Sequence, residues 1–152
     1  MGDSRMTVIV WDGVTLAADK QATQSDLARK AKKIRRIRGH LVGASGQWDL
    51  AQEMFDWFAQ GAQRETWPAT QRDDNKWVGL LVITPRRRIL KYESSPIPID
   101  FTVERRYAFG SGRDFAYGAM AMGASAREAV LVASKYDINC GMGVDTLMLE
   151  ER

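Results

Sequence analysis

The sequence contains very little cysteine and histidine, and this scarcity removes several kinds of chemistry. There is one cysteine, Cys140, and one histidine, His40. A single cysteine cannot form an internal disulfide, which is typical of a reducing compartment. A zinc cluster of cysteine and histidine ligands is excluded within one chain, and we expect neither a metal nor a cofactor. His40 follows Gly39 and has no nucleophile motif around it, so we interpret it as a turn or strand residue. A nucleophilic enzyme with this composition needs a base other than histidine.

Long apolar runs and a strong excess of one charge are also missing. No apolar run approaches the roughly 18–20 residues that cross a bilayer, and the N-terminus lacks the apolar core of a signal peptide. The 22 basic and 19 acidic side chains leave a formal charge of only +3 over 152 residues. Apolar residues make up 45% and charged residues 27%, as in ordinary globular proteins. We therefore expect one cytoplasmic domain without a membrane segment.

Short strands dominate the beginning of the chain. Asp12-Gly13 stands between two runs rich in β-branched residues and is a strong signal for a tight hairpin turn. The polar stretch 21–25 predicts a loop, and Arg38-Gly39 predicts a second hairpin turn. The strands expected in these two antiparallel hairpins are 7–11, 14–19, 33–37 and 40–44.

After Gly46 the apolar residues recur at helical spacing. This period predicts an amphipathic helix over about residues 47–63, whose apolar stripe includes Leu50, Met54, Trp57 and Phe58. The aromatic residues of this helix have two interpretations, a contact between subunits or an ordinary buried core.

The second half of the chain alternates strands with helices. Pro96 and Pro98 restrict their segment to an edge strand or a loop. Small residues after position 112 predict a closely packed helix, at Ala116, Gly118, Ala119 and Ala121. Ser125 and Glu128 form a capping box that begins a further helix, which we expect to end near Tyr136. The remaining extended segments are expected at 77–84, 88–92, 101–109 and 144–149. This order indicates a single α+β domain in which helices cover antiparallel sheets.

Several short motifs stand in one order along nearly the whole chain. They are Thr7 at the first strand, Ala18-Asp19, Lys33 in a basic run, the turn from Ala44 to Asp49, Gly110-Ser111-Gly112, and the segment from Ser134 to Asp145. This set resembles HslV-type and proteasome β-type threonine peptidases, which are N-terminal nucleophile hydrolases. Their mature chains begin with threonine, an aspartate ends the second strand and a lysine begins the third. Cys140 is a departure, because the archaeal proteasome β pattern has serine there.

The resemblance implies a fold, an activity and partners. The fold is the four-layer αββα sandwich with antiparallel sheets. The activity is that of a threonine-type endopeptidase subunit, working inside a ring of identical subunits. A polypeptide substrate and an ATP-dependent unfoldase are the implied partners.

A threonine at the start of a chain carries a hydroxyl and an α-amine on adjacent carbons. The unperturbed pKa of such an amine is about 7.7–8.0, so near neutral pH it can accept the hydroxyl proton. The resemblance assigns Thr7 as the nucleophile, Lys33 as the positive charge that lowers the pKa of the amine, and Asp19 as the group that holds Lys33. Taken alone, Thr7 is a strand residue, Asp19 a strand-end carboxylate, and Lys33 one of seven cations between Arg29 and Arg38.

Three further residues receive roles from the same resemblance. The backbone amide of Gly46 faces the oxyanion, and Ser111 and Asp137 orient the terminal amine. Each also has an ordinary structural interpretation: Gly46 as a turn into a helix, Ser111 as a helix cap, and Asp137 as a helix-end residue. Asp137 stands where the helix macrodipole disfavours an acid, which gives slight independent support for a special role.

The mechanism requires a free amine on Thr7, whereas six residues precede it in this sequence. Residues 1–6 are therefore interpreted as an N-terminal extension or propeptide, and 7–152 as the peptidase domain. The alternatives are a catalytically inactive structural or assembly subunit of the same fold and a hydrolase of small amides. The basic run 29–38 leaves a nucleic-acid-binding module as a further alternative, against which the small net charge argues.

Overall fold

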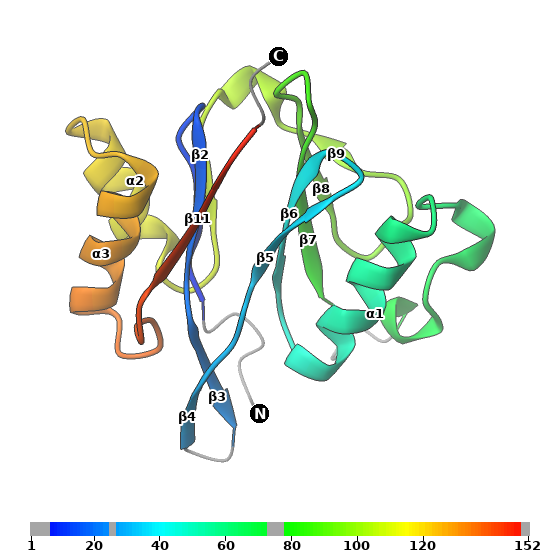
Figure 1. Ribbon diagram of the computed structural model, residues 1–152, viewed down its shortest axis with the longest axis horizontal. Helices are drawn as coiled ribbons and strands as arrows, with labels where there is room; N and C mark the ends of the chain where they lie inside the picture. The colour runs from blue at the N-terminus through cyan, green and yellow to red at the C-terminus, as the bar shows by residue number, and fades with distance from the viewer. Residues whose placement is uncertain (1–6, 25–26, 73–77, 150–152) are drawn as a thin grey trace.

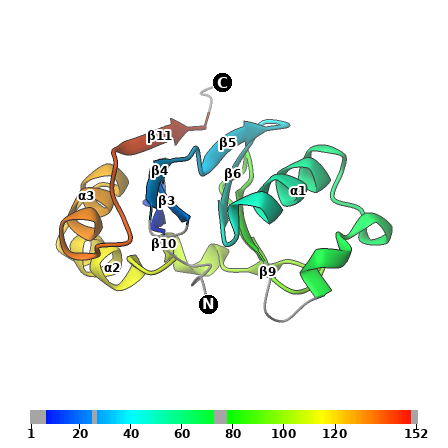
Figure 2. The same cartoon turned by 90° about the horizontal axis from the view of Figure 1, so that it is seen from below.

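Two antiparallel β-sheets pack face to face between layers of helices in the computed structural model (Figures 1 and 2). The structure describes residues 7–24, 27–72 and 78–149. One helix, α1, covers the outer face of the larger sheet, and the pair α2 and α3 covers the outer face of the smaller sheet (Figure 2). The expected α+β, four-layer αββα sandwich is confirmed. The extension at 1–6 lies outside the described residues. So do Ser25, the last residue of the expected loop 21–25, and Trp77, the first residue of the expected extended segment 77–84.

The first sheet has the strand order β10-β1-β2-β11. Its strands are β1 (Ile9–Trp11), β2 (Thr15–Asp19), β10 (Tyr107–Phe109) and β11 (Val144–Met148). The predicted hairpin of β1 and β2 is confirmed, with Ile9 opposite Ala18. The turn between them uses Gly13 at φ +99°, and the Asp12 carboxylate accepts hydrogen bonds from the backbone N–H groups of Val14 and Thr15.

The second sheet has the strand order β5-β6-β7-β8-β9. Its strands are β5 (Ile34–Ile37), β6 (His40–Ser45), β7 (Gly79–Ile83), β8 (Ile89–Tyr92) and β9 (Ile99–Asp100). The predicted pairing of β5 with β6 is confirmed, and β7 pairs antiparallel with β8. The short β9 follows the two prolines at the edge of the sheet, as their missing N–H groups require.

A third, two-stranded sheet occupies the segment that we expected to be a loop. Strands β3 (Gln21–Gln24) and β4 (Leu27–Lys30) pair antiparallel and extend from the ends of β2 and β5 (Figure 1). The loop prediction is therefore wrong. All four residues of β4 are exposed, so this strand lacks the alternation of buried apolar and exposed polar residues by which a strand is predicted.

The expected helix beginnings are confirmed, as is the end of α3 at Tyr136, whereas α1 ends earlier than expected. Helix α1 covers Trp48–Ala59 and gives way at Gln60 to two 3-10 segments, Arg64–Thr66 and Ala69–Arg72, so the expected extension to residue 63 is wrong. Helix α2 covers Arg113–Ala121, and α3 covers Ala126–Tyr136. The capping box of α3 is confirmed: Ser125 Oγ accepts from the Glu128 N–H, and the Glu128 carboxylate accepts from the Ser125 N–H.

Two further expectations need correction. Residues 101–109 are not extended throughout, because a 3-10 turn at Thr102–Glu104 precedes β10. Arg105 ends this turn with φ +63°. Gly118 does not serve close packing, since it is exposed and a Cβ at this position would have nothing within 4 Å. The packing role holds for Ala116, which is fully buried against β1 and α3.

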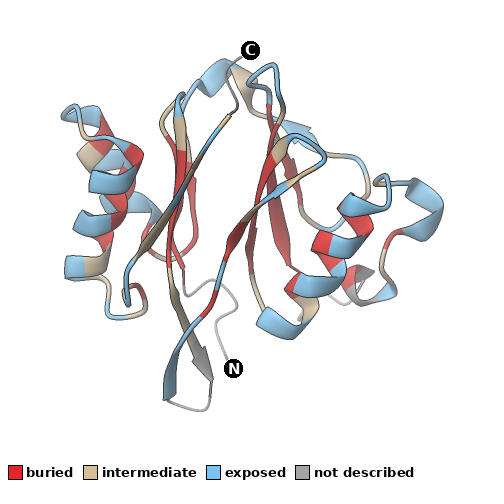
Figure 3. Ribbon diagram, viewed as in Figure 1, coloured by how far each residue is buried: buried red, intermediate tan, exposed pale blue. Residues whose placement is uncertain are grey.

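Buried residues line the inner faces of all four layers (Figure 3). The aromatic stripe of α1 belongs to the core, with Phe55, Trp57 and Phe58 at most 5% exposed. The indole of Trp57 packs edge-on against Trp67 and Tyr92, at centroid distances of 4.8 and 5.1 Å. The interpretation of this stripe as an ordinary core is the one that the structure supports.

Candidate active site

Thr7 lies immediately before β1, and its hydroxyl contacts two charged groups. Lys33 Nζ donates to Thr7 Oγ1 over 2.6 Å, and Thr7 Oγ1 donates to Asp19 Oδ1 over 3.0 Å. Lys33 Nζ also lies 2.8 Å from Asp19 Oδ1. All three residues are at most 4% exposed. Thr7, Asp19 and Lys33 therefore form one buried cluster around the Thr7 hydroxyl.

Asp19, the last residue of β2, is held by backbone groups as well as by this cluster. Its Oδ1 accepts from the Val8 N–H over 3.1 Å, and its Oδ2 accepts from the N–H groups of Gln21 and Gly141 over 3.2 and 3.1 Å. Every one of these partners is a donor, which suits the ionised carboxylate. A fully buried carboxylate with this environment is a fixed negative charge beneath Lys33.

Lys33 precedes β5 and continues its ladder, because its carbonyl accepts from the Ala44 N–H over 3.0 Å. Burial lowers the pKa of Lys33 below the ordinary lysine value, whereas the charge of Asp19 and its hydrogen bond act in the opposite direction. The ammonium form fits the geometry, since it donates to both Thr7 and Asp19. Lys33 thus brings positive charge directly to the Thr7 hydroxyl.

The segment Gly110-Ser111-Gly112 encloses the other side of Thr7. A Cβ at Gly110, where φ is +100°, would overlap the carbonyl oxygen of Thr7 and lie 2.6 Å from its Cγ2. The Gly112 N–H donates to the same carbonyl over 3.1 Å. Only glycine fits at position 110, and this close approach fixes the backbone of Thr7. Sequence reasoning missed the role of Gly110, although its place before Ser111 was a usable signal.

Ser111, Asp137 and Cys140 form a chain of polar contacts beside Thr7. Ser111 Oγ donates to the Thr7 carbonyl oxygen over 3.4 Å and lies 3.8 Å from Cys140 Sγ. Cys140 Sγ donates to Asp137 Oδ2 over 3.5 Å, and the Asn139 N–H donates to Asp137 Oδ1 over 2.9 Å. Asp137, the C-cap of α3, is therefore connected to Thr7 through Cys140 and Ser111.

The two acidic groups of this chain ionise very differently. Partial burial opposes ionisation of Asp137, but its hydrogen bonds, led by the one from the Asn139 N–H, outweigh it and hold the pKa of this carboxyl below its usual range. Burial, reinforced by the charge of Asp19, raises the pKa of the Cys140 thiol to about 12. The thiol is thus neutral near pH 7 and acts as a hydrogen-bond donor rather than as a nucleophile.

Gly46 follows β6 and has φ +146°, a conformation that favours glycine. Gly46 is connected to the Thr7 cluster through the sheet. Ala44, two residues before Gly46, donates its N–H to the carbonyl of Lys33. Ser45, between them, is 5% exposed, and its hydroxyl has no partner among the described residues. Of the six residues predicted from the sequence, Thr7, Asp19 and Lys33 contact one another directly. Ser111 contacts the Thr7 carbonyl, and Asp137 is linked to Ser111 through Cys140. Gly46 lies at the end of the neighbouring strand β6.

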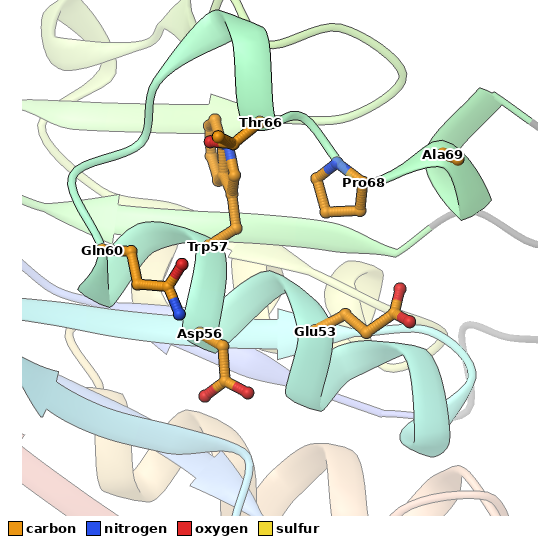
Figure 4. A pocket seen from close by; sticks show the side chains of 7 residues that line it. All are labelled: Glu53, Asp56, Trp57, Gln60, Thr66, Pro68 and Ala69. Atoms are coloured by element: carbon orange, nitrogen blue, oxygen red, sulfur yellow. The ribbon is translucent and has the colours of Figure 1, made fainter.

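A depression of about 340 Å³ lies elsewhere, on the outer side of α1 (Figure 4). Its lining residues are Glu53, Asp56, Trp57, Gln60, Thr66, Pro68 and Ala69. None of them belongs to the Thr7 cluster, so the two sites are separate. Across residues 7–24, 27–72 and 78–149, no group of three or more histidine, cysteine, aspartate or glutamate side chains is arranged to hold a metal ion.

This fold is that of the HslV-like and proteasome-like N-terminal nucleophile hydrolases. The chain is similar to BPH from Thiobacillus denitrificans, with 21% identity over 96% of this chain and 99% of that one and a TM-score of 0.67. It is similar to eukaryotic HslV from Trypanosoma brucei, with 23% identity over 95% and 99% of the two chains and a TM-score of 0.67. It is also similar to a Gly-1 mutant of Anbu from Hyphomicrobium sp. strain MC1, with 14% identity over 95% and 81% and a TM-score of 0.67. No protein-family model and no curated protein matches the sequence.

At these identities the similarity concerns the fold. Among the residues that the structure describes, no helix has both the length and the apolar character needed to span a membrane.

Proposed function

We propose that the chain is a threonine-type endopeptidase subunit whose nucleophile is Thr7 after removal of residues 1–6. The observation that carries the proposal is the buried contact of the Thr7 hydroxyl with Lys33 and Asp19. A threonine that only filled a strand position would not need a buried ammonium 2.6 Å from its oxygen. The charged pair costs desolvation free energy, which is understandable where its field acts on a reacting group.

The freed α-amine of Thr7 supplies the base that histidine supplies in other hydrolases. The positive charge of Lys33 disfavours protonation of this amine and stabilises negative charge developing on Thr7 Oγ1. Oγ1 bonds to the carbonyl carbon of the substrate while its proton moves to the amine. The C–N bond then breaks, and the leaving amine takes the proton. A water molecule hydrolyses the resulting ester by the reverse proton path and regenerates Thr7.

The remaining residues of the site position these groups. The backbone amide of Gly46 stabilises the oxyanion, and loss of one such donor typically costs about a hundredfold in rate or more. Ser111 and Gly112 hold the Thr7 carbonyl, and Asp137 is aligned behind them through Cys140. We expect this polar chain to orient the free amine and the charge of Lys33 to act on it.

We propose further that the subunit works in a homo-oligomeric ring, with polypeptide substrates and an ATP-dependent unfoldase as partners. The support is the shared fold together with exposed apolar side chains on α2 and α3. Phe115 and Tyr136 stack at a centroid distance of 5.8 Å while remaining 42% and 61% exposed, and Met122 is 89% exposed. Such a surface is costly for a monomer and suits a contact between subunits.

Peptidase assays on protein with a verified N-terminus test the proposal. Intact mass first establishes whether the chain begins at Thr7, and fluorogenic peptide amides then report cleavage. We expect cleavage by the processed chain, none by Thr7→Ala, and unchanged cleavage by Thr66→Ala, which removes an exposed hydroxyl at the end of a 3-10 segment. Protein that retains residues 1–6 and cleaves nothing after assembly would identify an inactive structural subunit. Equal cleavage by Thr7→Ala would contradict the assignment of the nucleophile.

A further inference from the structure

The basic run at 29–38 is left without a role by the chemistry of Thr7. It contributes seven cations, and Lys33 is the only one of them in an ion pair within the described part of the chain. Two of the other six turn to backbone carbonyls away from the site, since Arg36 donates to Met148 O and Arg38 to Phe58 O. The remaining four, here named the cationic rim, are Arg29, Lys30, Lys32 and Arg35.

The cationic rim is not neutralised by its strand neighbours. Arg29 and Lys30 lie opposite Ala22 and Gln21 in the β3–β4 pair, and Arg35 lies opposite Val42 in the β5–β6 pair. None of these partners is acidic. These neighbouring like charges therefore create a positive potential around this stretch of the chain.

The rim borders the nucleophile. The N–H of Gln21, which is opposite Lys30, donates to the same Asp19 carboxylate that holds Lys33. The Ala31 N–H donates to the carbonyl of Lys20, which follows Asp19, over 2.7 Å. The stretch from Lys30 to Lys33 therefore runs along the edge of the Thr7 cluster. Figure 1 shows β4 continuing toward β5 beside the end of β2.

Arg35 is the member of the rim that is fixed in place. Residues two apart in an extended chain are about 6.6 Å from each other, so the backbone of Arg35 lies about that far along the strand from Lys33, while the side chain of Arg35 turns to α1. Its Nη2 donates to Gln52 Oε1 over 2.9 Å, and its guanidinium carbon lies 4.4 Å from the centre of the Phe55 ring. Both partners are on α1 and both are neutral, so they hold the guanidinium without compensating its charge. Asp56 is reached only through the side-chain amide of Gln52.

We infer that the cationic rim selects acidic polypeptide segments, with Arg35 contacting an acidic side chain on the residue that supplies the scissile carbonyl. A guanidinium held by neutral partners is well suited to bind a carboxylate through two hydrogen bonds. Arg29, Lys30 and Lys32 attract acidic residues farther from the scissile bond and increase the local concentration of such segments. This inference rests on the proposed peptidase activity of Thr7 and names its substrate class.

A nucleic acid is a poorer occupant for this surface. Arg35 is half-buried between Gln52 and Phe55, whereas phosphate contacts use accessible cations along a continuous face. The rim also follows the edge of the Thr7 site, where the proposed nucleophile can cleave an acidic peptide.

Matched peptide substrates test the inference, with protein whose intact mass shows that the chain begins at Thr7. The peptides are identical except for Glu, Leu or Lys at the residue before a fluorogenic amide. We expect kcat/KM for the Glu peptide to exceed that for the Leu peptide by about tenfold. Raising the salt from about 0.05 to 0.5 M lowers this ratio, because salt screens exposed charges. Arg35→Gln brings the ratio close to one, whereas Arg38→Gln, at the far end of β5, leaves it unchanged.

The outcomes separate this inference from the proposed function. Thr7-dependent cleavage with equal rates for Glu and Leu peptides, or an unchanged ratio in Arg35→Gln, overturns the acidic preference and leaves the peptidase standing. Absence of Thr7-dependent cleavage across the panel contradicts the proposed function, and the substrate class falls with it. Tight binding of single-stranded RNA that falls steeply with salt and is lost when Arg29, Lys30 and Lys32 are changed to Gln would assign the rim to nucleic acid instead.

Discussion

The buried pair of Lys33 and Asp19 gives a double-mutant cycle whose outcome the geometry determines. Asp19→Asn keeps the shape of the side chain but removes its charge. In either orientation of the new amide, its NH₂ group faces donors. These are the N–H groups of Gln21 and Gly141 in one orientation, and Lys33, the N–H of Val8 and the Thr7 hydroxyl in the other. Lys33, 4% exposed, loses its carboxylate partner as well. Removing one partner of a buried pair costs about 3–5 kcal/mol, and each unsatisfied buried N–H costs about 1–3 kcal/mol.

The second arm of the cycle is Lys33→Met, which fills a similar volume. Asp19 then keeps three backbone donors and the Thr7 hydroxyl, so its charge stays solvated by hydrogen bonds. In the double variant Asp19→Asn/Lys33→Met no uncompensated charge remains. We expect it to be at least as stable as Asp19→Asn alone, with a coupling free energy of about 2 kcal/mol or more.

Guanidinium denaturation followed by tryptophan fluorescence measures the four free energies of unfolding, provided the slopes agree among variants. The matched control is Lys20 with Asp145, a Lys–Asp pair whose side chains are 34% and 28% exposed and 3.6 Å apart. Its coupling is expected to be about 0–1 kcal/mol. Additivity of the Asp19 and Lys33 effects within about 0.5 kcal/mol would refute the account of this pair as a coupled buried charge.

Three other predictions use the same site. The pH profile of cleavage rises as the Thr7 amine loses its proton and falls as Lys33 deprotonates. Because burial lowers the pKa of Lys33, the alkaline limb has its midpoint below 10.5, and a midpoint above that value contradicts the geometry. Gly110→Ala lowers the free energy of unfolding by about 2–4 kcal/mol through overlap and strain, whereas Gly118→Ala, in open space on α2, raises it by up to about 1 kcal/mol; similar effects in a denaturant titration would rule out the close approach. Cys140, buried and with a pKa of about 12, reacts with iodoacetamide at least about a hundredfold more slowly in the folded than in the denatured protein, and equal labelling rates would show an accessible thiolate.

Local signals in the sequence were sufficient where the structure depends on neighbours in the chain. Asp12-Gly13 predicted the first hairpin because the turn needs a positive φ and an acceptor for two nearby N–H groups. Ser125 and Glu128 predicted the start of α3 because a capping box is complete within four residues. The element order also led to the sandwich, since helices and strands alternate in blocks.

The rest depends on contacts between distant segments. The β3–β4 hairpin escaped prediction because all of β4 is exposed and the hairpin is defined by its backbone pairing. Asp19 accepts from Gly141, 122 residues away, and Gly110 approaches Thr7 across more than a hundred residues. The roles of Thr7 and Lys33 came from resemblance, because nothing in the local sequence distinguishes Lys33 from six other cations.

Trapping the nucleophile tests the central claim most directly. A β-lactone acylates a nucleophilic hydroxyl when its strained ring opens, so the adduct gains the mass of the whole reagent. In protein whose chain begins at Thr7, we predict one adduct per chain, located by peptide mapping on Thr7 Oγ1. The adduct should be absent from Thr7→Ala and strongly reduced in Lys33→Met. An adduct on Ser111 or Cys140, or active protein that forms no Thr7 adduct, would contradict the account.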